Sequence, residues 1–118
     1  MNGSMSKLGS DGLRRRLDEA VVLRQTVEQL RKDLREPGLA LPATGEKAFE
    51  DLRAQVLAVL RARESEGGHA FGLVINRVDL TERQLQQLLK GGLNDLAAAV
   101  VLRCLQKVLS RMRYAGLA

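Results

Sequence analysis

The chain has 118 residues, of which 45% are hydrophobic and 28% charged, so a single domain can bury a core without disulfides or metal. Only 3% of the residues are aromatic, so leucine, valine and alanine must build the core, which favours helices over a β-sandwich. A formal net charge of +5 favours a polyanionic partner, because lysine and arginine neutralise phosphates and release counterions.

The first segment, MNGSMSKLGSDG, lacks the apolar centre of a signal peptide. The sequence also has no run of about 20 apolar residues that could cross a membrane. We therefore expect no membrane association and a cytoplasmic protein, or a nuclear one in a eukaryote. A second methionine after Gly-Ser indicates a leader, so residues 1–9 are expected to be disordered or appended and to lie outside the fold.

An amphipathic helix is expected over residues 10–36, because its apolar residues recur at steps of three and four and so form one narrow stripe. The members of the stripe are Leu13, Leu17, Ala20, Leu23, Val27, Leu30 and Leu34. Such a stripe suits a partner helix or a second copy of the chain, and all its members except Ala20 are candidate partner-binding residues. The other side chains, including Asp33, form a mixed-charge surface that is expected to be solvated.

A linker is expected at residues 37–45, which contain two prolines and two glycines. A helical domain is expected to follow over residues 46–118. It should begin with an amphipathic helix from about Glu46 to Glu64, which Gly67 and Gly68 end.

The next segment, HAFGLVINRV at residues 69–78, contains a strand-like Leu-Val-Ile. The sequence offers no second strand to pair with it, so helix is the better prediction, with strand left open. The helix after it is marked by a capping box between Thr81 and Gln84. It should begin at Glu82, and Gly91 should end it in the left-handed conformation.

The last helix, from about Asp95 to Arg113 with Asn94 as its cap, is the most apolar and should lie at the centre of the fold. Cys104 lies in its apolar run, which predicts a buried, unreactive thiol rather than a redox or metal site. The polar side of the helix carries three cations at steps of four, which we call the basic ridge. The basic ridge consists of Arg103, Lys107 and Arg111.

No catalytic site can be assembled from the sequence, which has one histidine, one cysteine and no GxSxG, P-loop, HExxH or CxxC motif. His69 follows two glycines at a helix start, where capping or surface roles are far more common than catalysis. We expect a protein that is not an enzyme and that has no cofactor, metal or small-molecule substrate.

Residues 71–90 resemble the helix-turn-helix unit of phage-repressor-like DNA-binding proteins, with Thr81 opening the second helix. The apolar positions of that unit are occupied by Val74, Val78, Leu80, Leu85 and Leu88. The chain departs from the family at Ile75, where a small residue is usual, and at Asp79, where glycine is preferred. The resemblance implies a recognition helix at 82–90, because arginine and glutamine pair with guanine and adenine edges. Its outward side chains would be Arg83, Gln84, Gln87 and Lys90.

These patterns predict an all-α fold of four or five helices, with a coiled-coil-like N-terminal helix and a helix-turn-helix. The predicted function is that of a small DNA-binding protein, similar to a transcriptional regulator. It would dimerise through its N-terminal helix and bind duplex DNA through the recognition helix and the basic ridge. The alternative is a non-enzymatic protein–protein interaction module or a subunit of a larger complex, in which helix 82–90 is an ordinary bundle helix.

Overall fold

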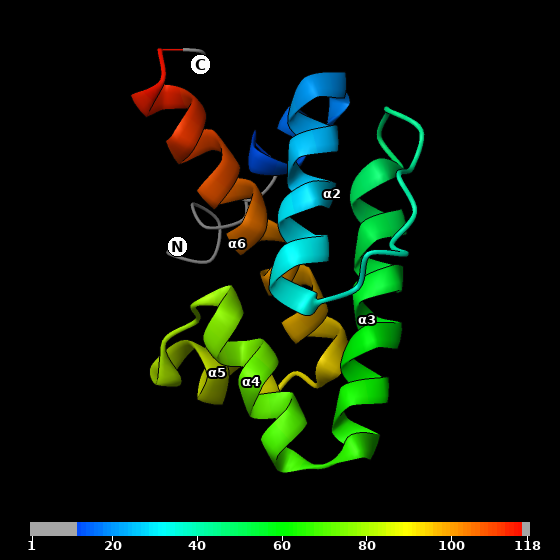
Figure 1. The fold of residues 1–118 in the computed structure, drawn as a ribbon, viewed down its shortest axis with the longest axis vertical. Helices are drawn as coiled ribbons and strands as arrows, with labels where there is room; N and C mark the ends of the chain where they lie inside the picture. Colours follow the sequence, from blue (N-terminus) through cyan, green and yellow to red (C-terminus); the bar gives the residue numbers. More distant parts are fainter. Residues whose placement is uncertain (1–11, 117–118) are drawn as a thin grey trace.

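The structure, a computed structural model, describes residues 12–116, so the expected leader lies outside the described residues. This part of the chain is all-helical and contains no strand (Figure 1). Its elements are η1 (Arg16–Asp18), α2 (Ala20–Leu34), α3 (Ala48–Glu66), α4 (Gly68–Val78), α5 (Glu82–Leu89) and α6 (Leu93–Tyr114). The all-α prediction is confirmed, and the ambiguous segment at 69–78 is helical. None of the described helices is long and apolar enough to cross a membrane.

The N-terminal segment is not one continuous helix. Residues 12–15 are helical, η1 is a short 3-10 turn, and α2 begins only after Glu19, whose backbone is extended. At the other end Arg35 takes the left-handed conformation, with φ 54°, and its backbone N–H closes the last turn of α2. The expected helix is therefore interrupted near its start and ends close to the predicted position.

The central element is α6, as its apolar surface predicted. It packs against α2, α3, α4 and α5, while α4 packs against α3 and α2 (Figure 1). Its inward face is fully buried at Leu96, Val100, Cys104 and Leu105. The core is thus built from leucine and valine side chains that converge on one helix.

The leucine stripe of the N-terminal segment lies in this same core. Leu13 is half-buried, and the remaining candidate partner-binding residues are at most 1% exposed. These are Leu17, Leu23, Val27, Leu30 and Leu34. The helices that pack against α2 are α3, α4 and α6 of the same chain. This corrects the expectation that the stripe binds a partner helix, because burial within the chain already removes its apolar surface from water.

The connection between α2 and α3 is tied to both helices. The guanidinium of Arg31 donates two hydrogen bonds to the carbonyl oxygen of Leu39, at 2.9 and 2.6 Å. The side chain of Gln55 accepts a hydrogen bond from the backbone N–H of Ala40 at 2.8 Å and donates one to its carbonyl oxygen at 2.9 Å. The segment predicted to be a linker therefore packs on the helices that it joins.

The start of α5 has the predicted capping box. The Thr81 hydroxyl accepts from the Gln84 backbone N–H at 3.1 Å, and the Gln84 side chain accepts from the Thr81 backbone N–H at 3.0 Å. Just before the cap, Asp79 has φ 70° and makes the turn out of α4. Aspartate tolerates this left-handed conformation better than most residues, so glycine is not needed here.

The turn between α5 and α6 differs from the prediction by one residue. Gly92, rather than Gly91, has the positive φ, 88°, and it is also the N-cap of α6. Asn94 therefore lies inside the helix, which has no side-chain cap. Its side-chain oxygen instead accepts a hydrogen bond from Arg53 of α3.

Candidate interaction surface

The short helix α5 lies on the surface of α6. It contributes no fully buried side chain: Leu85 and Leu88 are half-buried, and Leu89 is 45% exposed. Its contacts are mainly with α6, whereas α4 packs against α3 and α2 (Figure 1). An amphipathic helix attached in this way leaves both its outer face and its junction with α6 open to a ligand.

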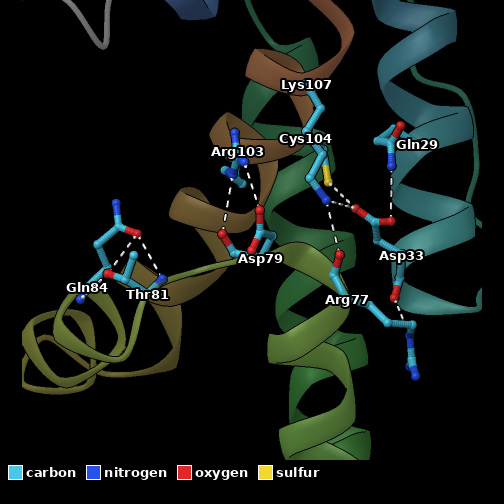
Figure 2. Close-up of polar contacts among 9 residues, drawn as sticks. All are labelled: Gln29, Asp33, Arg77, Asp79, Thr81, Gln84, Arg103, Cys104 and Lys107. Carbon is cyan, nitrogen blue, oxygen red and sulfur yellow. Dashed lines mark hydrogen bonds and ion pairs between the residues drawn. The ribbon is translucent and has the colours of Figure 1, made fainter.

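The four side chains predicted to point outward from α5 are all exposed. Gln84 is committed to the capping box, where its side-chain oxygen lies close to Thr81 (Figure 2). The other three make no side-chain hydrogen bond or ion pair within residues 12–116. They are Arg83, Gln87 and Lys90.

The basic ridge of α6 does not form a free surface beside α5. Arg103 turns toward the end of α4, where its Nη2 lies 3.1 Å from Asp79 Oδ2 and its Nε lies 3.4 Å from the Asp79 carbonyl oxygen (Figure 2). Arg111 donates to the side-chain oxygen of Gln29 on α2 at 2.5 Å. These side chains join α6 to α4 and α2, so they are not the open row of phosphate contacts that their spacing predicted.

Lys107, the middle cation of the ridge, points at a buried carboxylate. Asp33 is only 5% exposed, and its Oδ2 lies 2.7 Å from Lys107 Nζ. The same carboxylate accepts from Gln29 Nε2 at 3.0 Å and from Cys104 Sγ at 3.5 Å. Lys107 also donates to the carbonyl oxygen of Arg77 at 3.0 Å, so the network links α2, α4 and α6 (Figure 2).

This network corrects two expectations from the sequence: Lys107 is paired within the fold rather than free on an open basic surface, and Asp33 is buried rather than solvated. A buried carboxylate needs a cation and hydrogen-bond donors, because its desolvation otherwise costs several kcal/mol. The spacing of Thr26, Gln29 and Asp33 in the sequence could have indicated that Asp33 is buried. These polar residues follow the leucine stripe at steps of three and four, so they lie at the edge of the same core.

Cys104 is buried, as predicted, at 0% exposed. Burial raises the pKa of its thiol above the ordinary value of 9.0, and the negative charge of Asp33 raises it further. Because the thiolate is the reactive form, we expect iodoacetamide to label the native protein far more slowly than the urea-unfolded protein, at neutral to mildly alkaline pH. Rapid stoichiometric labelling without denaturant would show that α6 leaves the core readily.

An apolar groove of about 310 Å³ lies between α5 and α6. Its apolar walls are formed by Leu80, Leu88, Ala99 and Leu102. Its rim is formed by Gln84, Gln87, Arg103 and Gln106. Of these lining residues only Arg103 is charged, and it is paired with Asp79. In a chain with 28% charged residues, an apolar groove rimmed by amides resembles the charge-depleted centre of a protein–protein interface.

The candidate surface therefore comprises the α5–α6 groove and the outer face of α5. Residues 12–116 contain no group of three or more histidine, cysteine, aspartate and glutamate side chains that could hold a metal ion. His69 is exposed near the start of α4. Comparisons of the chain with models of protein families, with curated proteins and with solved structures found no match.

Proposed function

We propose that this chain is a non-enzymatic helical interaction module that binds a protein partner in the α5–α6 groove. The observation that carries the proposal is the groove itself, which is lined by four apolar residues and rimmed mainly by amide side chains. A leucine-sized side chain that moves from water into such a site contributes about 1.5–3 kcal/mol. Two or three such side chains therefore offset part of the free-energy cost of the translational and rotational freedom that is lost on association.

An amphipathic helix is the partner that fits this groove. The groove lies between two helices, which is the arrangement into which a third helix can place an apolar face. The side chains of Gln87 and Gln106 each carry a donor and an acceptor. They can therefore satisfy the polar groups that flank the apolar face of a partner helix.

Site-specific photo-crosslinking of the full chain tests this function. A photoreactive amino acid in place of the exposed Gln106 samples the rim of the groove, and the same amino acid in place of the exposed Arg61 on α3 is the matched control. We expect a covalent protein adduct from position 106 and none from position 61 in cells that produce the protein. No adduct at position 106, or equal adducts at both positions, would contradict the proposal.

A second candidate function is DNA binding through the outer face of α5. It is favoured by three exposed side chains, which can read base edges or contact phosphates. They are Arg83, Gln87 and Lys90. This proposal is narrower than the prediction from the sequence, because the cations of the basic ridge bind Asp79, Asp33 and Gln29 instead.

Titration of labelled duplex DNA with the full chain at low and at physiological salt tests this candidate. Affinity should fall steeply as salt rises, because phosphate contacts release counterions. Arg83→Ala should cost about 1–3 kcal/mol on a preferred site, and Lys90→Ala should weaken binding to every duplex, with Arg61→Ala as the control. If no duplex binds more tightly than about 100 micromolar at low salt, the weak limit of non-specific affinity, this candidate is eliminated.

A further inference from the structure

The outer face of α6 carries a heptad pattern that lies at the edge of the core and is only partly buried. Six residues recur at alternating steps of four and three, the spacing by which one α-helix packs alongside another. They are Asp95, Ala99, Leu102, Gln106, Leu109 and Arg113, which we call the outer seam. The inward face of α6, with Val100 and Cys104, lies on a different side of the helix. Leu102 and Leu109 pack against the edge of the core with part of their surface and leave the rest accessible.

Every member of the outer seam retains accessible surface. Asp95, Gln106 and Arg113 are exposed, whereas the apolar members between them are half-buried. Three members of the seam line the α5–α6 groove: Ala99, Leu102 and Gln106. Leu109 and Arg113 lie nearer the C-terminal end of α6, and this end of the helix extends past α5 (Figure 1). The seam thus continues the groove along the outside of one helix, over about 27 Å at 1.5 Å per residue.

We propose that the outer seam binds the outer seam of a second copy of this chain, with the two α6 helices antiparallel. This inference rests on the proposed function, because the seam includes the groove. The antiparallel register places Ala99 of one copy opposite Leu109 of the other, and Leu102 opposite Gln106. The Ala99–Leu109 pair then places a small side chain opposite a large one, as in a packed helix pair.

The charges at the two ends of the outer seam favour a second copy. In the same register Asp95 of each copy lies opposite Arg113 of the other, so the symmetry of the pair creates two opposite-charge contacts. Neither residue belongs to an ion pair within residues 12–116. A parallel pair would instead place like charges together, which disfavours it.

The centre of the seam is also compatible with a symmetric dimer. From Ala99 to Leu109 the members of the seam are neutral, and Arg103, the charged residue that lines the groove beside them, is paired with Asp79. The amide of Gln106 can donate to and accept from its symmetry mate near the twofold axis. A polar residue at such a position selects one register and orientation.

Sedimentation equilibrium of the full chain from micromolar to millimolar concentration tests the inference. The wild-type chain should show a monomer–dimer equilibrium. Gln106→Arg places two arginines near the twofold axis and should weaken association at least about tenfold, because juxtaposed like charges are costly at an interface. Gln86→Arg, the same change at an exposed position of α5 outside the groove lining, should leave association unchanged.

Charge reversal tests the register. Arg113→Asp alone should weaken the dimer, and the Asp95→Arg/Arg113→Asp double variant should recover it, because the two opposite-charge contacts re-form in reversed order. A wild-type chain that stays monomeric, a dimer unaffected by Gln106→Arg, or a double variant without recovery would overturn the inference. A monomeric chain that still crosslinks to another protein from position 106 would leave the interaction module standing, whereas no crosslinking there would remove that function as well.

Discussion

Leu30→Ala is expected to lower the free energy of unfolding by about 3 kcal/mol, within the range for leucine truncation in a packed core. Leu30 is 0% exposed and belongs to the core cluster formed with α3, α4 and α6. Its neighbours are close-packed and can fill the resulting cavity only in part, so the lost contacts add to the lost burial. Urea denaturation followed by far-UV circular dichroism measures the change.

Val21→Ala is the matched control, because Val21 lies on the same helix but is 50% exposed. Its effect should stay within about 0.5 kcal/mol, as for most surface substitutions. A Leu30→Ala variant as stable as the wild type would mean that the stripe is not part of the core. The stripe would then be available to bind a partner helix.

Lys107→Met is expected to cost about 3 kcal/mol, because removal of one partner of a buried ion pair leaves the other charge uncompensated. The side chains of Lys107 and Asp33 are 19% and 7% exposed. Methionine keeps the length and the apolar part of the lysine side chain, so the variant removes mainly the ammonium group. The same urea titration measures the loss.

Two further variants show whether the buried charge is the cause. Asp33→Asn combined with Lys107→Met should be more stable than Lys107→Met alone, because the double variant leaves no buried charge without a partner. Arg103→Met breaks the pair with Asp79, whose side chain is 74% exposed, and should cost no more than about 1 kcal/mol. Equal losses for Lys107→Met and Arg103→Met would contradict the structural role of the buried pair.

Several elements follow from residues that are close together in the chain. The start of α5 was predictable because a capping box is formed by Thr81 and Gln84 alone, three residues apart. The helical state of α4 was predictable because the sequence offers no second strand with which residues 69–78 could pair. The central place of α6 was predictable because this helix carries apolar residues on more than one side. Such a helix must be covered by several neighbouring helices.

The candidate site was predictable only in part. The exposed face of α5 followed from the periodicity of the helix, because residues opposite Leu85 and Leu88 must point outward. The α5–α6 groove was not predictable, since it depends on how one helix lies on another. The basic ridge was interpreted incorrectly, because steps of four show that three cations share a face and do not show what that face meets.

By itself the sequence determined that the chain is helical, most of the helix ends and most of the apolar residues that avoid water, because capping and periodicity act over a few neighbouring residues. Only the tertiary structure decided what covers each apolar stripe. The stripe of α2 could pack against another chain or against its own, and the short connection that Arg31 and Gln55 hold in place brings it back onto α6. The pairing of Asp33 with Lys107, which are 74 residues apart, likewise depends on where α2, α4 and α6 cross. No local pattern encodes that crossing, because it results from the packing of all the helices together.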